Sequence, residues 1–163
     1  MRRSIMAALT LATALAATPA AAAEWYLHSG DRNCAVTPGM CSLMEVRITD
    51  MNDLVIAYSR PKPTLASIGI GPGELLVSGR LYNGQLVGTA RRYKLYGTTR
   101  CSLSYQVRGV ISQGQGFVLQ GPAPNFHPNR CGKIGELSMD NDQSVLTFTY
   151  IGSGQTAPNV SYR

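Results

Sequence analysis

The dipeptide Asn83-Gly84 lies between two runs in which apolar and polar residues alternate, ELLVSGRLY before it and QLVGTARRYKLY after it. Asn and Gly both tolerate positive φ angles, so this pair predicts a two-residue turn between two antiparallel strands. Such a turn pairs Tyr82 with Gln85 and thereby fixes every later pair. One face of the hairpin is then apolar or small and should face the core. Its pairs are Leu81 with Leu86, Gly79 with Gly88, Val77 with Ala90, and Leu75 with Arg92.

Arg92 is the exception on that face, because its charge would be buried beside Leu75. Burying an unpaired charge costs a large free energy. The opposite face carries Arg80 and, in the same register, Arg91. We therefore expect a bulge or the end of a strand near Arg91 and Arg92, which would keep both charges in contact with solvent.

Short alternating runs of the same kind recur along the chain, separated by Gly, Pro, Asn and Asp. A period of two predicts half-buried strands, and no stretch beyond the N-terminal segment has a convincing helical period. About eight antiparallel strands at this spacing predict an all-β fold, either a small β-sandwich or a small β-barrel. We expect strands at 44–49, 54–59, 74–82, 85–96, 102–109, 117–121 and 144–151, an irregular segment at 60–63, and a long loop at 121–132.

The N-terminal segment has the pattern of a secretory signal peptide, with two arginines, an alanine-rich apolar run and small residues near Ala21 to Ala23. We expect residues 1–23 to be removed, residues 24–151 to form a single all-β domain, and residues 152–163 to be a flexible tail. No other apolar run approaches the ~20 residues that a membrane-spanning helix needs. The sequence thus predicts export to the bacterial periplasm or secretion, without a membrane span.

The cysteines form an even set in a chain that we expect to be exported, which indicates two disulfides rather than free thiols. The four are Cys34, Cys41, Cys101 and Cys131. Four cysteines allow three connectivities. We favour Cys34–Cys41, because the Pro-Gly turn in CAVTPGMC folds the chain back, and this leaves Cys101 to pair with Cys131.

The charges are distributed unevenly along the chain. The sixty-one residues from Leu75 to Gly135 contain eight Lys and Arg and no Asp or Glu, whereas the flanks 24–74 and 136–163 are each net −2. A sheet built from the middle strands should therefore have a positive potential on one side. Tyrosines beside these cations would add stacking contacts. The candidate binding residues are Arg80, Tyr82, Arg91, Arg92, Tyr93, Lys94 and Tyr96.

These residues favour an exported, non-enzymatic binding or interaction module with a basic, tyrosine-containing face. Its partner would be an anionic lipid, an anionic glycan or an envelope protein, and no motif indicates a dedicated nucleic-acid partner. Solubilising charge that discourages aggregation of strands would give the same pattern. The alternative functions are a small apolar-ligand carrier of barrel type and an uncharacterised hydrolase. The carrier requires an open cavity in place of a filled core.

The sequence gives little support for catalysis or for a metal site. A hydrolase would need His28 or His127 within hydrogen-bond reach of a serine or an acid in a cleft, and Ser153 lacks the Gly-x-Ser-x-Gly spacing of a nucleophile elbow. A metal site beside these histidines would need thiolates, which disulfide-bonded cysteines do not supply. The segment DNDQS at 140–144 fits a turn better than a calcium loop. We expect no metal and no cofactor, and the sequence favours a protein that is not an enzyme.

Several segments resemble a type of small exported bacterial protein that has no assigned activity. They are LLVSGRLYNGQLVGTARRYK, YQVRG, LQGPAPNFHPNRC and LTFTYI, and the shared pattern covers roughly residues 54–151. The resemblance implies an all-β fold and a Cys101–Cys131 disulfide. It implies no catalytic residues, because the shared pattern consists of turns, core positions and cysteines.

Overall fold

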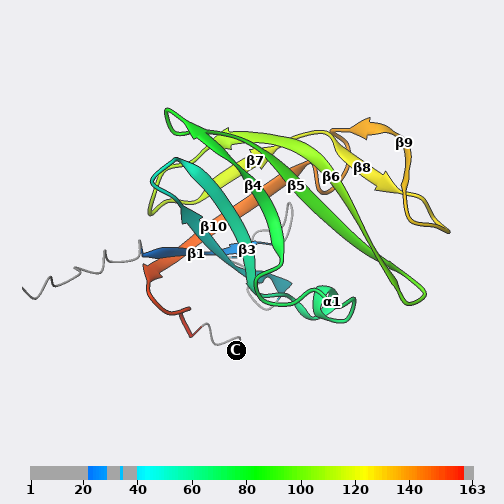
Figure 1. The fold of residues 1–163 in the computed structure, drawn as a ribbon, viewed down its shortest axis with the longest axis horizontal. Coiled ribbons are helices and arrows are strands. Elements are labelled where there is room, and N and C mark those ends of the chain that lie inside the picture. The colour runs from blue at the N-terminus through cyan, green and yellow to red at the C-terminus, as the bar shows by residue number, and fades with distance from the viewer. Residues whose placement is uncertain (1–21, 29–33, 35–39, 160–163) are drawn as a thin grey trace, which may run out of the picture.

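The structure is a computed structural model that describes residues 22–28, 34 and 40–159 (Figure 1). The part of the chain it describes consists mainly of β-strands, with one short helix. The strands are β1 (Ala23–His28), β2 (Ser42–Ile48), β3 (Asp53–Arg60), β4 (Leu75–Tyr82), β5 (Gln85–Tyr96), β6 (Thr99–Val110), β7 (Phe117–Gln120), β8 (Ala123–Phe126), β9 (Lys133–Ser138) and β10 (Val145–Gly154), and the helix is α1 (Pro63–Ala66). This confirms the predicted all-β class. No helix among these residues is long and apolar enough to cross a membrane.

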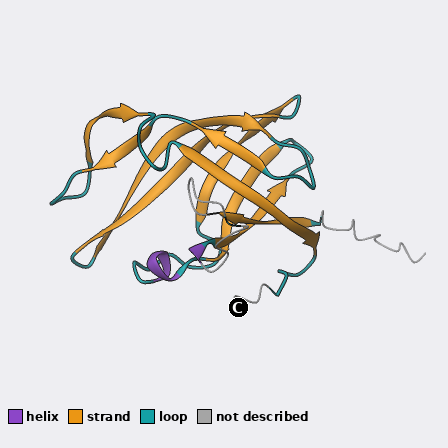
Figure 2. Cartoon of the chain, turned by 180° about the vertical axis from the view of Figure 1, so that it is seen from behind, coloured by secondary structure: helices purple, strands orange, loops and turns teal. Residues whose placement is uncertain are grey.

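Eight of the strands close into an antiparallel barrel in the order β1-β10-β7-β6-β5-β4-β3-β2. The fold is therefore the barrel, and not the sandwich, of the two architectures expected. Strands that follow one another in the sequence are neighbours from β1 to β7, and β10 closes the ring between β7 and β1. The strands β8 and β9 form a separate two-stranded sheet outside this ring, beside β6 (Figure 2).

The hairpin of β4 and β5 has the predicted register, from Tyr82 paired with Gln85 to Val77 paired with Ala90. Asn83 and Gly84 have φ angles of 52° and 78°, as a two-residue turn with two left-handed residues requires. The face predicted to be apolar points into the barrel, where Val77, Leu86 and Ala90 are fully buried. The alternation of residue types alone was therefore sufficient to orient this hairpin.

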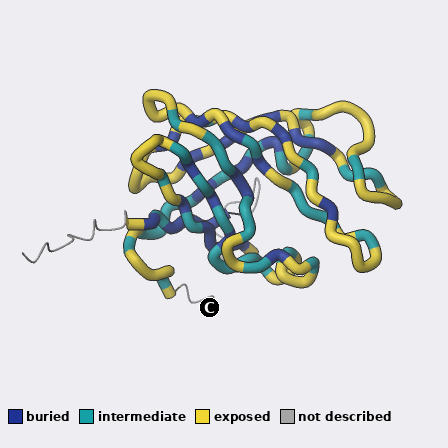
Figure 3. The backbone as a smooth tube through the Cα atoms, viewed as in Figure 1, coloured by how far each residue is buried: buried dark blue, intermediate teal, exposed yellow. Residues whose placement is uncertain are grey.

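The barrel interior is filled by side chains from every strand of the ring, and the buried positions alternate along the strands (Figure 3). Aromatic rings form a continuous cluster within it. The Phe117 ring lies 4.6 Å from that of Phe148 and 5.0 Å from that of Tyr26, measured between centroids. These rings exclude solvent from the part of the barrel that they occupy.

Both predicted disulfides are present. Cys34 is bonded to Cys41 with a Cα–Cα distance of 5.9 Å, and Cys101 is bonded to Cys131 at 5.4 Å. The second bond ties the start of β6 to the residues just before β9. Two disulfides are consistent with an oxidising location outside the cytoplasm.

Some segments differ from the sequence-based expectation. The segment 121–132, expected to be a loop, contains β8, and β9 follows it. Neither strand was predicted, because Pro124 in β8 argues against a strand and β9 lacks clear alternation. The segment expected to be irregular leads into α1, which is too short to show a helical period. Strand β10 extends to Gly154, three residues into the predicted tail, and there pairs with β1, which we did not predict as a strand. The predicted signal peptide, apart from its last two residues, lies outside the described residues.

Two glycines allow a close approach at the seam between β6 and β7. The register pairs Arg108 with Gln120 at this seam. A Cβ atom on Gly121 would lie 1.8 Å from the main-chain oxygen of Gln106, and one on Gly109 would lie 2.2 Å from that of Val118. Both contacts are with backbone atoms, which do not move aside as a flexible side chain would. Closure at this seam therefore requires residues without a side chain.

We expect Gly121→Ala to lower the free energy of unfolding by about 3 kcal/mol, because the added methyl group forces the backbones of the seam apart. Urea denaturation measures the change. The control is Gly71→Ala, since a Cβ atom at Gly71 meets nothing within 4 Å. We expect the control to change the free energy by less than about 0.5 kcal/mol. Equal stability of the two variants would contradict this account of the seam.

Candidate functional site

Strand β5 separates from β4 just before the two adjacent arginines. The β4–β5 pairing ends at Val77 and Ala90, whereas on its other side β4 stays paired with β3 as far as Leu75 and Ala57. On its other side β5 stays paired with β6 as far as Tyr96, without a register shift. The expected interruption is thus the end of the β4 pairing rather than a bulge in β5. The barrel wall is open here between two strands that are neighbours elsewhere.

A cavity of about 190 Å³ lies at this end of the barrel, which we call the barrel mouth. Six elements or their flanking residues contribute to it: β1, β2, β3, β4, β5 and the start of α1, with one further residue just before β10. Among the described residues, the lining contains three cations and no carboxylate. The lining residues are His28, Ser42, Tyr58, Lys62, Leu65, Leu76, Arg91, Arg92, Tyr93 and Gln143.

Arg92 is held in place inside the mouth. Its side chain is 19% exposed. Its Nη1 donates to the main-chain oxygen of Pro124 at 2.5 Å and to Oδ1 of Asn141 at 3.0 Å. Its guanidinium also lies 5.6 Å from the centre of the Phe126 ring and 3.6 Å from a carboxylate oxygen of Asp142. Arg92 thus keeps part of the expected contact with solvent, and neighbouring polar groups compensate the burial of the rest.

Arg91 differs from Arg92 in both exposure and partners. Its residue is exposed, and it lines the cavity from the outer edge. None of the described carboxylates forms a salt bridge with it. The next residue, Tyr93, donates its hydroxyl hydrogen to the main-chain oxygen of Leu75 at 2.6 Å, which ties β5 to the start of β4 across the gap. Arg91 is therefore a cation that can pair with an incoming anion.

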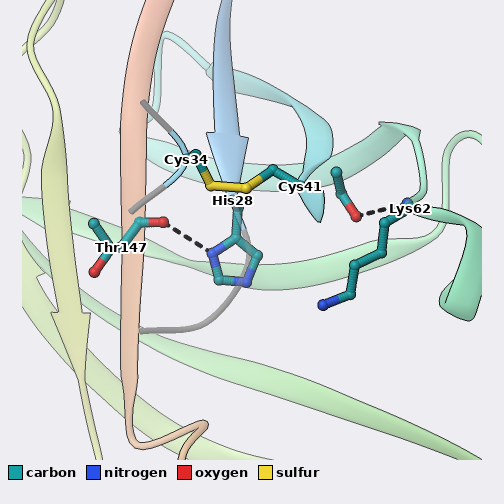
Figure 4. Close-up of a disulfide and its surroundings, with 6 residues drawn as sticks. His28, Cys34, Cys41, Lys62 and Thr147 are labelled. Carbon is teal, nitrogen blue, oxygen red and sulfur yellow. Dashed lines mark hydrogen bonds between the residues drawn. A yellow bond between two sulfur atoms is a disulfide. The ribbon is translucent and has the colours of Figure 1, made fainter. Parts of the chain in front are cut away.

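His28 lies beneath the Cys34–Cys41 disulfide at the inner part of the mouth (Figure 4). Its Nδ1 is 3.0 Å from the main-chain oxygen of Thr147, and its ring stacks on Phe148 at 4.6 Å. A carbonyl partner requires that Nδ1 carries the hydrogen. Burial lowers the pKa of His28 to about 4, and the positive charge of Lys62 acts in the same direction. His28 is thus a neutral residue at ordinary pH.

Lys62 reaches the mouth because the residues before α1 are anchored to β2. The N–H of Lys62 donates to Oγ of Ser42 at 2.9 Å, and Lys62 is the residue that immediately precedes α1 (Figure 4). Pro63 begins the helix with the φ angle that a first turn needs. The short helix therefore places Lys62 and Leu65 over the cavity.

The structure brings together three of the seven residues predicted to bind, namely Arg91, Arg92 and Tyr93. Arg80 and Tyr82 lie at the opposite end of the hairpin, beside the Asn83-Gly84 turn. Farther along β5 than the cavity, the Lys94 ammonium lies 4.8 Å from the centre of the Tyr96 ring. The Tyr96 hydroxyl donates to the main-chain oxygen of His127 and is not among the groups that line the cavity. The single basic face expected from the sequence is therefore divided among three places.

Acids from the flanking segments pair with cations of the acid-free segment. The shortest N–O distances are 2.9 Å for Arg80 with Asp53, 2.8 Å for Arg100 with Glu74 and 3.6 Å for Arg92 with Asp142. All three acids lie outside 75–135 in the sequence. Folding thus compensates part of the positive charge that the sequence concentrates in this segment, and Arg91 is left without such a partner among the described residues.

The described residues show no arrangement suited to a bound metal. They contain no group of three or more His, Cys, Asp and Glu side chains that would hold an ion. In the DNDQS segment, Asn141 hydrogen-bonds to Arg92 through Oδ1 and to Asn125 through Nδ2. Asn141 thus supports the barrel mouth through these hydrogen bonds. His28 and Ser42 share the cavity, but the contacts above direct each of them toward the main chain.

The sequence analysis did not identify Ser42, Tyr58, Lys62 or Gln143, and it considered His28 only for catalysis and metal binding. His28 ends β1, Ser42 begins β2 and Tyr58 lies near the end of β3. In an up-and-down arrangement, the end of one strand meets the start of the next at the same end of the barrel. The strand order would have indicated this group, but only if β1 had been recognised as a strand.

We expect the buried His28 to make the protein less stable in acid. Its pKa is lower in the folded chain than the ordinary 6.5 of the unfolded chain, so the unfolded chain binds the proton first as the pH falls. As the pH falls from 6.5 to 4, the free energy of unfolding should therefore decrease, and His28 should account for about 3 kcal/mol of the decrease. Above pH 6.5 and below pH 4 the contribution of His28 should be constant. His28→Gln should remove that part of the pH dependence in urea titrations. An NMR titration of the wild-type ring with a midpoint near 6.5 would contradict it.

The barrel mouth combines a fixed cation, an exposed cation and a neutral inner surface in a cavity of small volume. Such an arrangement suits the binding of a small anionic group. No known family model, curated protein or solved structure matches this chain.

Proposed function

We propose that this protein is an exported, non-enzymatic binding module whose barrel mouth receives the anionic group of an envelope component. The observation that supports it most directly is the composition of the cavity lining, whose described residues include Lys62, Arg91 and Arg92 and no carboxylate. Opposite charges attract much more strongly in a partly enclosed site than in bulk water. A lining of this kind favours an anion over a neutral or cationic ligand.

The two arginines would contribute in different ways. Arg92 is already fixed by Pro124 and Asn141, so binding costs little further ordering of its side chain. Arg91 is exposed and is not neutralised by a described acid, so it is the cation that a ligand would meet first. We therefore assign the main electrostatic contribution to Arg91 and the shaping of the site to Arg92.

The structure gives less support to the two alternative functions. An apolar-ligand carrier would need a lining that is mainly apolar. Here six of the ten lining residues are polar or charged: His28, Ser42, Lys62, Arg91, Arg92 and Gln143. A hydrolase would use His28 as a base toward a serine. The Ser42 hydroxyl oxygen instead accepts the main-chain N–H of Lys62.

We expect Arg91→Glu to weaken the binding of small anions at least about tenfold, because an attraction of about 1 to 4 kcal/mol near the surface becomes a repulsion. The probes are D-glucuronate and inorganic phosphate, measured by isothermal titration calorimetry. Binding to the wild-type protein should also weaken as salt rises from about 20 to 300 mM, since surface charges are then screened.

Arg108→Glu is the matched control, because it makes the same change of charge at an exposed position of β6 that does not line the cavity. It should leave both affinities within about twofold of the wild-type values. Binding of both probes that survives Arg91→Glu, or that does not depend on salt, would rule out the barrel mouth as an anion site.

A further inference from the structure

The Tyr58 hydroxyl is a polar group in the cavity. It has no hydrogen-bond partner among the described residues. Tyr58 is 4% exposed and lines the cavity from the inner end of β3. Among the described residues, none accepts a hydrogen bond from its hydroxyl. The hydroxyl is not one of the fully buried atoms without a partner, so it is accessible from the cavity. Buried polar groups in proteins nearly always have a partner. A donor in this position is available to an acceptor on a ligand that enters the cavity.

Other tyrosines near the barrel mouth do not share this property. The hydroxyls of Tyr93 and Tyr105 donate to the main-chain oxygens of Leu75 and Gln143. Burial raises the pKa of Tyr58, and the nearby Tyr93, Tyr105 and Glu74 raise it further. Tyr58 thus remains a protonated donor at any ordinary pH. Its hydroxyl differs from those of its neighbours in facing the cavity without a described acceptor.

The size of the cavity limits the ligand to a single ring. A cavity of about 150 Å³ in a protein core holds one benzene molecule. The volume of about 190 Å³ here is therefore sufficient for one six-membered ring with a small substituent. The ring of His28 lines the cavity and stacks on Phe148, which stacks on Phe117, so the ligand cannot extend deeper into the barrel.

The polar lining favours a ring that carries hydroxyl groups. The side-chain amide of Gln143 and the hydroxyl of Ser42 both donate and accept hydrogen bonds. Leu65, Leu76 and the Tyr93 ring supply apolar surfaces that suit the C–H faces of a sugar. An aromatic acid of equal size would leave most of the polar groups without partners, which costs free energy.

We infer that the barrel mouth binds a single acidic sugar ring of the hexuronate class, either free or as the terminal unit of a glycan. Its carboxylate lies at Arg91, and one of its oxygens accepts the hydrogen bond of Tyr58. This inference rests on the proposed function, because it specifies which anion the site receives. A free sugar or a terminal unit places one ring in the cavity, which matches the volume of about 190 Å³.

The test compares four probes by calorimetry on the wild-type protein: D-glucuronate, D-glucose, benzoate and inorganic phosphate. D-glucuronate should bind at least about tenfold more tightly than D-glucose, which lacks the charge, and than benzoate, which lacks the hydroxyls. The methyl glycoside of D-glucuronate should bind as well as the free sugar if the natural ligand is a terminal unit, and more weakly if it is the free sugar. A benzoate affinity equal to that of D-glucuronate would overturn the sugar assignment.

Tyr58→Phe then tests the hydrogen bond itself. It should weaken D-glucuronate about fivefold, the effect of one neutral hydrogen bond, and leave phosphate bound at Arg91 within about twofold. Tyr82→Phe is the control, because Tyr82 is exposed at the far end of the hairpin. Urea denaturation should show that both variants fold. An unchanged D-glucuronate affinity in Tyr58→Phe would overturn the inference, while phosphate binding that is lost in Arg91→Glu would still support the proposed function.

Discussion

The partial burial of the Arg92 guanidinium is the constraint around which the barrel mouth is organised. The register of the β4–β5 hairpin places Arg92 on the face of β5 that is apolar in every other pair. A charge in that position is stable only if polar groups surround it. The Pro124 oxygen of β8 and the Asn141 side chain before β10 supply these groups, so two distant segments converge on this residue. The cavity exists because β4 does not continue alongside β5 at the same place.

Folding partly compensates the uneven charge distribution of the sequence. Along the sequence, the segment 75–135 has eight cations and no acid. In space, Asp53, Glu74 and Asp142 from the flanks approach three of those cations. The net charge of a segment therefore overestimates the potential that its surface presents. Among the described residues, Arg91 is the arginine at the mouth that no acid compensates, so the charge there is local rather than spread over a broad basic face.

The parts of the fold that depend on neighbouring residues could be predicted, and those that depend on barrel closure could not. The Asn83-Gly84 turn determined the register of the β4–β5 hairpin, and the Pro-Gly turn indicated the Cys34–Cys41 bond. The strand pairing of β1 with β10, by contrast, joins residues from the two ends of the domain. The position of Arg92 was predicted correctly, but its partners were not, because Pro124 and Asn141 reach it only through the tertiary fold. The same holds for the cavity lining, which six elements or flanking residues share.

One stack of rings both fills the middle of the barrel and forms the inner surface of the barrel mouth. The stack that runs from His28 through Phe148 to Phe117 leaves no room for a ligand in the middle of the barrel. Because His28 is the polar member of that stack and stays neutral down to about pH 4, the inner surface of the cavity carries no charge at ordinary pH. The positive charge of the site comes from Lys62, Arg91 and Arg92 instead. Under the proposed function, an anionic group would be drawn to the cations around the cavity, and the uncharged remainder of the ligand would lie against the rings. A small barrel with a filled core would then select a ligand by both charge and shape.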